Sequence, residues 1–520
     1  MKSSNSSHFL LVPFLAWGHT RPICALAARM ISENPNLLIT IFAEARFLQK
    51  SRFEVTRQFD AESPIIKRIR ILSIFRPIQG DLAKITEAFG ESYAVAYETL
   101  AKAEPITCTE TGTTFEAVPA PTALIIDHHV NQFVALPQLK ASRALTGHSV
   151  PIIAWMSGAG SSSIRVWAPE SLGGFGDFGA KAEAEAACVG RSLDDVAEEL
   201  YQRMAEAGAV VRIPGLPPMY DYEFEPHKFS PMPPLASFVL IGGREFLLNS
   251  DAFLIASSDS YEKESLDGLR GWFAQMQRTL YAVGPLLPSN STFRSDNDKN
   301  AGIEVFLDNI LQAHGKHSLF FISFGTVFWP TDSPDYLEEV IEGFIEKKTP
   351  FILAHASPFA NPIPAQLSEK INASNLGLLT SWSPQQFILQ HPATGWFLTH
   401  GGNGSVTESL SSGVPMIFWP FQADQPCAAA NVTENLKAGI ELFEVRTGKG
   451  LRPIYRNGKT PKGTREAVGE EIRYVVDMCR GPEGEELRRN AERLKVEFNC
   501  AWEEGGSARL AMRQFLKDYA

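Results

Sequence analysis

Short apolar runs recur along the whole chain, and most of them lead through a turn into a segment with helical periodicity. In the first half, the runs expected to form strands are 8–14, 37–44, 67–74, 123–127, 151–155, 251–258 and 280–287. A second series follows at 319–326, 350–356, 376–381, 395–400 and 414–419. Buried strands that alternate with helices are typical of a parallel sheet covered on both faces. The pattern predicts two doubly wound α/β domains, one after the other.

Length supports two domains, because 520 residues are too many for one hydrophobic core. The polar, turn-forming stretch 288–302 is the best linker in the sequence. We therefore predict an N-terminal domain over 1–287, a linker over 288–302, a C-terminal domain over 303–483 and a charged amphipathic helix within 484–520. The proline- and aromatic-rich segment from Pro214 to Pro234 is predicted to be a surface excursion.

Composition narrows the class of protein. Hydrophobic residues make up 44% and charged residues 21% of the chain, and the net charge of −11 argues against nucleic-acid binding. No run approaches the ~20 apolar residues of a membrane helix. Six cysteines without paired spacing predict neither a disulfide framework nor a zinc site. A glycan on the sequon at Asn403 would block the glycine-rich turn around it, so we expect a cytoplasmic protein.

Polar and aromatic side chains follow several predicted strands. His19 follows the first strand and Asp127 ends the fourth, while Thr326, Trp382 and His400 follow strands of the second series. Ligands of doubly wound sheets bind outside the carboxyl ends of the strands. A cleft between the two domains is expected to gather these five residues.

The stretch from Trp382 to Gln425 is rich in glycine and hydroxyl residues and contains no Lys or Arg. A phosphate bound there must be held mainly by backbone amides and a helix dipole. The turn that begins at His400 has glycines at 401, 402 and 404, which let the backbone approach a diphosphate closely.

On these residues the chain resembles family 1 UDP-glycosyltransferases. The stretch Trp382–Gln425 is similar to the donor-binding box of the plant enzymes, with WSPQ, HGGxxSxxE, GVP, WP and DQ in place. Three further motifs match: GHxxP at Gly18–Pro22, YAVGPL at Tyr281–Leu286 and SFGT at Ser323–Thr326. The plant sequence HCGWNS is HGGNGS here, which is closer to non-plant members. The resemblance implies the GT-B fold, α/β with two Rossmann-like doubly wound domains facing each other across a cleft. In such a fold 1–287 would bind the acceptor, 303–483 would bind the UDP-sugar, and the C-terminal helix of 484–520 would pack back on the N-terminal domain.

The resemblance also implies a donor site for a UDP-sugar. Its expected residues are Gly18, Thr326, Trp382, Ser383, Gln385, His400, Gly402, Asn403, Gly404, Ser405, Glu408, Asp424 and Gln425. Trp382 would stack on the uracil ring while the Ser383 backbone reads its edge, and Gln385 and Glu408 would bind the ribose. His400 and Ser405 would contact the diphosphate, with Thr326 nearby. Asp424 and Gln425 would hold the sugar, and the glutamine matches glucose-using members.

Four of these residues also have a purely structural alternative. Trp382 could fill a crevice, His400 could be a satisfied core histidine, Glu408 could be an exposed helix residue and Asp424 could be a helix N-cap.

His19 and Asp127 are the implied catalytic dyad. The imidazole would take a proton from the acceptor hydroxyl, and the carboxylate would fix its tautomer. A single displacement would invert the anomeric centre and give a β-glycoside. No cofactor and no metal are expected. His128 and His129 are alternative partners, but Asp127 is preferred because adjacent strand residues point apart.

The acceptor is expected to be a small lipophilic or phenolic molecule. Its candidate contacts are Trp17, Met156, Ser157, Phe328 and Trp329, each equally plausible as a core residue.

Two other motifs are read as coincidental. The G-x-G-x-x-G spacing at 174–179 follows no strand, and the D-x-D at 296–298 lies in the linker, so neither a dinucleotide site nor a metal site is expected there.

Two alternative functions remain at this stage: a UDP-sugar hydrolase or epimerase of the same fold, and a non-catalytic nucleotide-sugar-binding protein.

Overall fold

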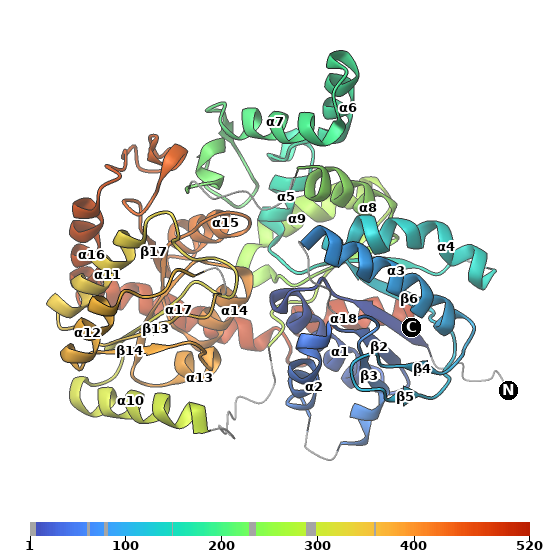
Figure 1. Ribbon diagram of the computed structural model, residues 1–520, viewed down its shortest axis with the longest axis horizontal. Helices are drawn as coiled ribbons and strands as arrows, with labels where there is room; N and C mark the ends of the chain where they lie inside the picture. The colour runs from blue at the N-terminus through green and yellow to red at the C-terminus, as the bar shows by residue number, and fades with distance from the viewer. Residues whose placement is uncertain are drawn as a thin grey trace. The chain divides into compact units, whose positions relative to one another are not determined.

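The computed structural model describes residues 7–59, 63–76, 82–147, 149–227, 236–287, 298–357 and 360–520 (Figure 1). The chain divides into two compact units. Unit 1 comprises Met1–Tyr201, Pro231–Ser291 and Ala501–Ala520, and unit 2 comprises Gln202–Ser230 and Thr292–Cys500. Most of the predicted linker, 288–297, lies outside the described residues, and so do two of the three residues of the D-x-D motif.

Unit 1 contains a seven-stranded parallel sheet in the order β11-β10-β7-β6-β1-β2-β3. Its strands are β1 (His8–Val12), β2 (Leu38–Phe42), β3 (Ile69–Leu72), β6 (Ala123–Asp127), β7 (Ile152–Met156), β10 (Ala252–Ile255) and β11 (Thr279–Ala282). Every residue of β1, β6 and β7 is buried, as expected for strands covered on both faces. The strand order reverses between β1 and β6, and such a switch point is where doubly wound sheets bind ligands.

The helices of unit 1 are α1 (Trp17–Glu33), α2 (Leu48–Thr56), α3 (Leu82–Ala101), α4 (Leu136–Thr146), α5 (Gly160–Trp167), α6 (Phe178–Val189), α7 (Leu193–Ala205), α8 (Gly243–Asn249), α9 (Asp259–Gln275) and α18 (Ser507–Tyr519). The last turn of α7 belongs to unit 2. A small antiparallel pair joins β4 (Ile106–Thr107) to β5 (Thr114–Phe115).

The last helix, α18, packs on the sheet of unit 1 and beside α1 (Figure 1). The Phe515 ring meets Phe9 of β1 at 6.0 Å and Tyr281 of β11 at 5.3 Å between centroids. The Tyr281 hydroxyl donates to Asp518 at 2.6 Å. The predicted C-terminal segment 484–520 is therefore divided, because α17 (Pro482–Cys500) belongs to unit 2 and α18 to unit 1.

Unit 2 contains a six-stranded parallel sheet in the order β14-β13-β12-β15-β16-β17. Its strands are β12 (Leu319–Ser323), β13 (Phe351–Ala354), β14 (Gly377–Thr380), β15 (Thr394–Thr399), β16 (Met416–Phe418) and β17 (Gly439–Glu441). The order reverses between β12 and β15, which places a second switch point in this sheet. The predicted α/β class is confirmed in both units.

The remaining helices of unit 2 are α10 (Asp298–His314), α11 (Pro334–Glu346), α12 (Ala365–Ser374), α13 (Gln385–Gln390), α14 (Asn403–Ser412), α15 (Gln425–Ala430) and α16 (Arg465–Cys479). Helices α11 and α16 pack against each other, and their apolar faces join the strand residues in one core. Across the described residues, none of the helices is both long and apolar enough to span a bilayer.

The prediction that 214–234 is a surface excursion is wrong for residues 214–227, the part that the structure describes. The segment pairs β9 (Met219–Tyr220) with β8 (Val210–Val211), and Tyr222, Glu223 and Phe224 are buried. The Tyr222 hydroxyl donates to the Pro453 carbonyl at 2.6 Å, and Glu223 accepts from the Tyr455 amide at 2.9 Å. These long-range contacts place 202–230 in unit 2. Local periodicity could not reveal them, because the partners lie more than two hundred residues away.

Candidate functional site

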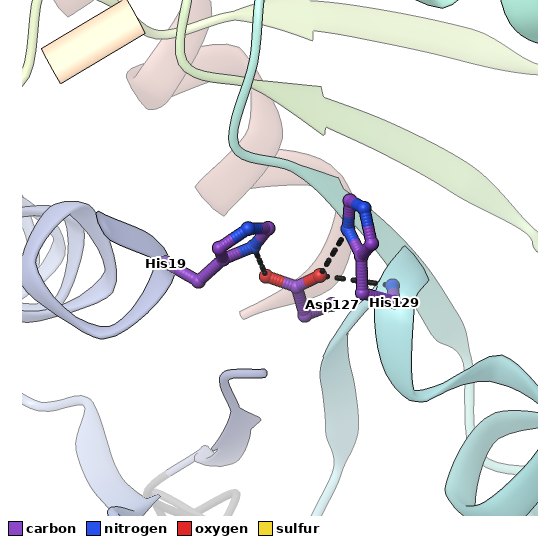
Figure 2. Close-up of side chains that lie close together, drawn as sticks. All are labelled: His19, Asp127 and His129. Atoms are coloured by element: carbon purple, nitrogen blue, oxygen red, sulfur yellow. Dashed lines mark hydrogen bonds and ion pairs between the residues drawn. The ribbon is translucent and has the colours of Figure 1, made fainter. Parts of the chain in front are cut away.

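His19 and Asp127 flank the switch point of the first sheet. His19 lies in the first turn of α1, directly after β1, and Asp127 is the last residue of β6, which pairs with β1. Nδ1 of His19 lies 2.8 Å from Oδ2 of Asp127, so the ring N–H donates to the carboxylate (Figure 2). The structure thus brings together the two residues that the sequence places 108 positions apart.

The Asp127 carboxylate is fully buried and bound at both oxygens. Its Oδ1 accepts from the backbone amide of His129 at 2.9 Å, and Nδ1 of His129 lies 3.4 Å from the same oxygen. Burial by itself would raise the pKa of Asp127, but the charge of His19 and the hydrogen bonds from His129 and His19 hold that pKa well below its usual range. A permanent negative charge therefore faces the His19 ring.

The His19 ring is fixed from several sides. Ser157, the residue after β7, places its hydroxyl 2.8 Å from Nδ1. The rings of Phe14 and His129 meet His19 edge-on, with centroids 5.2 and 4.6 Å away. With Nδ1 bound to Asp127, Nε2 on the far side of the ring is the atom that can accept a proton.

His128, one of the alternative partners, lies with its Nδ1 3.8 Å from Oδ1 of Asp127 but forms its hydrogen bond elsewhere. Its Nδ1 bonds to the Trp155 carbonyl at 3.0 Å, and burial lowers the pKa of the ring to about 3. His129 does approach Asp127, as described above. The sequence could not separate these two histidines, because both follow a strand end where a short turn sets their directions.

A second cluster lies at the switch point of unit 2. His400 follows β15, and the glycine-containing turn Gly325–Thr326 follows the neighbouring β12. A Cβ at Gly325, which has φ +76°, would lie 2.8 Å from Cε1 of His400, and a Cβ at Gly402 would lie 2.6 Å from Nε2. Only glycine leaves room for the ring at these positions. Burial lowers the pKa of His400 to about 4, so the ring is neutral at neutral pH.

Helix α14 begins beside His400. Its N-cap is Gly402, which has no side chain to cap the first amides. The amide of Asn403 donates to Oδ2 of Asp424 at 2.9 Å, so this carboxylate bonds across to α14 and does not cap its own helix, α15. A Cβ at Gly404 would meet no atom within 4 Å. The helix N-terminus is thus lined by backbone and by short side chains, as anion binding requires.

Ser405, Glu408 and Gln385 form one hydrogen-bonded group. Glu408 is buried on α14, one turn after Ser405. The side-chain amide of Gln385 donates to Oε2 of Glu408 and, at 3.4 Å, to the Ser405 hydroxyl. Glu408 is therefore not the exposed helix glutamate of the structural alternative.

The Trp382 side chain is 45% exposed. It follows β14, and two hydrogen bonds to the Thr380 hydroxyl hold its backbone. The hydroxyl accepts from the Trp382 amide at 3.3 Å and donates to the Trp382 carbonyl. An indole held this way offers a planar face for stacking. Ser383 lies next to it in the turn before α13.

Gln425 begins α15 and is buried. Its side-chain oxygen accepts from the Phe421 amide at 2.8 Å, so its NH₂ group remains as the donor that a ligand could use.

The expected acceptor contacts differ in their surroundings. Met156 is buried at the end of β7, and Trp17 lies 5.8 Å from Phe47 between ring centroids. Phe328 stacks on His400 at 5.9 Å. Trp329 is only 4% exposed and belongs to the hydrophobic core of unit 2, which favours its alternative as a core residue.

Sequence reasoning missed Phe14 and Gly325, which pack directly on His19 and His400. Both stand at the carboxyl ends of predicted strands, so the signal that located the histidines was also present for them.

Comparisons with known proteins find similarity to UDP-glycosyltransferases. The family model described as UDP-glucoronosyl and UDP-glucosyl transferase matches residues 284–451. UDP-glycosyltransferase eriJ of Hericium erinaceus is 28% identical over 540 residues, which cover 99% of this chain and 100% of that protein. UDP-glycosyltransferase 84A1 of Arabidopsis thaliana is 30% identical over 286 residues, or 54% of each chain.

Solved structures match over nearly the whole chain. The Medicago truncatula enzyme UGT71G1, complexed with UDP-glucose, has a TM-score of 0.69 at 19% identity and covers 100% of both chains. Phytolacca americana UGT2, complexed with UDP-2fluoro-glucose and pterostilbene, has a TM-score of 0.66 at 18% identity and covers 99% of both chains. At these identities the likeness shows a shared fold.

Proposed function

Since this chain belongs to the family of UDP-glycosyltransferases, we propose that it transfers glucose from UDP-glucose to a hydroxyl group of a small phenolic or lipophilic acceptor. Glycosyltransferase activity follows from the family, and the predicted GT-B fold is confirmed. The identity of the sugar, the class of acceptor and the residue roles below are the proposal.

The observation that carries the proposed mechanism is the 2.8 Å bond between His19 Nδ1 and Asp127 Oδ2. It directs Nε2 of His19 to act as the general base. The acceptor hydroxyl gives its proton to Nε2, and the oxygen attacks C1 of the sugar. The bond from C1 to the β-phosphate oxygen breaks, and UDP leaves with the electron pair. Attack from the opposite face inverts the anomeric centre.

Asp127 stabilises the imidazolium that forms, because its charge is buried and already directed at the ring. A positioned base of this kind contributes about 10²–10⁴-fold to the rate.

The donor site is proposed to hold UDP without a basic side chain. The amides at the start of α14 and an N–H of the neutral His400 would face the diphosphate, as expected at a helix N-terminus. Trp382 would stack on uracil, and the buried Glu408 would accept hydrogen bonds from the ribose. These groups balance the charge of the leaving UDP, so we propose that the reaction uses no metal ion.

Two observations support glucose and a phenolic acceptor. Gln425 ends the donor box, as it does in glucose-using members of the family, and its NH₂ group is the part left for a sugar hydroxyl. Relatives include UDP-glucosyltransferases of Panax ginseng, and pterostilbene, a phenol, is bound in the similar Phytolacca americana structure.

The experiment is an incubation of the full chain with radiolabelled UDP-glucose and a panel of phenols, sterols and hydroxy fatty acids, with and without a chelator. We expect a labelled β-glycoside and one UDP per transfer, unaffected by the chelator. Release of UDP and glucose without a labelled acceptor would favour the hydrolase alternative. Labelling only with another UDP-sugar would overturn the choice of glucose.

A further inference from the structure

The catalytic pair has a third neighbour that the mechanism does not use. Ligand atoms of His19, Asp127 and His129 all lie within 4.8 Å of one another, and among the described residues this is the one group of three such side chains. Figure 2 shows both rings on either side of the carboxylate, each near a different oxygen. His19 Nδ1 lies 2.8 Å from Oδ2, and His129 Nδ1 lies 3.4 Å from Oδ1.

The Nδ1 atom of His129 is shielded from solvent, and its contact with Oδ1 of Asp127, at 3.4 Å, is long for a hydrogen bond. A buried ring nitrogen with so weak a partner costs free energy. A structural role alone would be served by the backbone amide of His129, which already donates to Asp127 at 2.9 Å. The imidazole is therefore an additional donor atom directed at the dyad.

We propose that His19, Asp127 and His129 form an inhibitory binding site for a divalent transition metal of the Zn²⁺ type. Two imidazoles and a carboxylate are ligands that Zn²⁺ prefers. Zinc bonds to them of about 2.0–2.2 Å in a tetrahedral shell place neighbouring donors about 3.4 Å apart. The separations of 2.8 and 3.4 Å run to different oxygens of Asp127, and with one ligand atom per residue all separations stay within 4.8 Å. The side chains must therefore draw together to reach the tetrahedral spacing. The Ser157 hydroxyl, 2.8 Å from His19 Nδ1, or a water completes the shell.

The metal acts on the base by displacing a proton. A metal ion on Nδ1 of His19 leaves the one remaining ring proton on Nε2, so the ring can no longer accept a proton there. It also occupies the carboxylate that would stabilise the imidazolium. No substrate bond changes, and the UDP-binding residues of unit 2 are untouched. The inhibitory effect rests on the proposed function, whereas metal binding does not.

A matched control exists elsewhere in the chain. His391 and Asp308 also form a histidine–carboxylate pair, with Nε2 and Oδ1 3.2 Å apart, but that pair is outside the three-residue group. His128 is excluded as a ligand through Nδ1, because that atom bonds to the Trp155 carbonyl.

The first test uses Co²⁺ as the probe, because its visible absorption distinguishes tetrahedral from octahedral coordination. Full-length chain without an affinity tag is titrated with Co²⁺, and the spectrum is then displaced with Zn²⁺. We expect one equivalent of tetrahedral Co²⁺ in the wild type and unchanged binding in His391→Gln. In His129→Gln, which keeps the backbone amide, affinity falls more than about 100-fold, beyond the roughly 10–100-fold loss expected for an outer-shell partner. An octahedral spectrum, or equal affinity in His129→Gln, overturns the site.

The second test measures glucosyl transfer with and without Zn²⁺ in each variant. The ratio of the rate with Zn²⁺ to the rate without Zn²⁺ should fall below one in the wild type and return to one when a chelator is added. In His129→Gln this ratio should stay near one. Metal binding that leaves the rate of glucosyl transfer unchanged overturns the proposal that the site is inhibitory. If no variant transfers sugar under any condition, the proposed function fails, and the Co²⁺ titration still decides the metal site. Circular dichroism and UDP binding verify that His129→Gln is folded, and His19→Gln provides a second variant that must lose Co²⁺.

Discussion

Asp127 holds a negative charge at the end of a fully buried strand, which is a costly place for a carboxylate. The cost is offset by hydrogen bonds at both oxygens and by the facing imidazole of His19. The same contacts that lower the pKa of Asp127 also fix the proton on Nδ1 of His19. Asp127 therefore supplies the negative charge that faces the proposed base and also fixes the tautomer of that base, His19.

We predict that Asp127→Asn lowers turnover by about 10²–10⁴-fold, because a neutral amide neither stabilises the imidazolium nor enforces the tautomer. UDP-glucose binding, measured by calorimetry, should remain as in the wild type, since no donor-site residue changes. Asp308→Asn, which alters the exposed partner of His391, is the matched control and should keep full turnover. Equal turnover in Asp127→Asn and the control would remove Asp127 from the mechanism.

The sequence could predict which residues lie in the site where those residues stand at or after the end of a buried strand. His19, Asp127 and His400 follow buried strands, so their position at a carboxyl sheet edge could be inferred before any contact was known. Trp329 and Phe328 could not be separated this way. Both follow β12 in one loop, and only packing shows that Trp329 enters the core whereas Phe328 stacks on His400.

At the scale of elements, both sites are strand-to-helix turns at the point where strand order reverses. The turn after β15 encloses His400 between glycine backbones, with Gly401 at φ +86° and Gly402 against Nε2. Glycine is required at position 402 because a side chain there would collide with the His400 ring, whether or not a ligand is bound. The neighbouring Gly404 has no such contact, which makes the two positions a matched pair.

We predict that Gly402→Ala raises the KM for UDP-glucose at least about tenfold, because its Cβ would lie 2.6 Å from Nε2 of His400 and push the ring from its place. Gly404→Ala adds a methyl group that meets no protein atom within 4 Å, so it should leave the His400 ring in place, raise KM less than Gly402→Ala does, and stabilise the helix by about 0.5–1 kcal/mol. Steady-state kinetics and thermal unfolding of both variants measure these effects. Similar KM values for the two variants would contradict the enclosure of His400.

Sequence periodicity predicted the alternation of strands with helices and the buried strands of both sheets, but it missed β17 and the buried part of 202–230. Strand β17 has three residues, too few to show a period. The buried part of 202–230 is held by side-chain bonds such as that from Tyr222 to Pro453, which leave no local pattern.

At the scale of the whole molecule, four histidines among the described residues are buried in a neutral state. Burial lowers the pKa to about 4 for His8 and His400 and to about 3 for His128 and His227. Their unfolded values lie near 6.5. Between these values the unfolded chain binds more protons, so the stabilising contribution is complete above about pH 6.5 and is lost as pH falls toward 4. Glu471 acts oppositely, because burial raises its pKa to about 7 and its contribution is lost as pH rises through that value.

We predict that acidification from neutral pH to about pH 5 costs unit 1 about 2 kcal/mol through His8 alone. His8→Gln should be less stable overall, because His8 bonds to the Pro119 carbonyl and to Thr40, but its unfolding midpoint should fall less on acidification than that of the wild type. His314→Gln changes an exposed side chain and should retain the wild-type difference. Thermal unfolding at the two pH values measures the effect, and an unchanged difference in His8→Gln would contradict it.

In the proposed mechanism the division into two units separates donor binding from proton transfer, since the proposed UDP-binding residues other than Gly18 lie in unit 2 and the proposed dyad lies in unit 1. Replacing His19 with Ala tests this account most directly. Calorimetry of UDP binding and steady-state glucosyl transfer are measured on the same preparation. We expect a wild-type Kd for UDP and a turnover lower by about 10²–10⁴-fold. Wild-type turnover in His19→Ala would contradict the proposed mechanism, and loss of UDP binding in a folded protein would contradict the separation of roles.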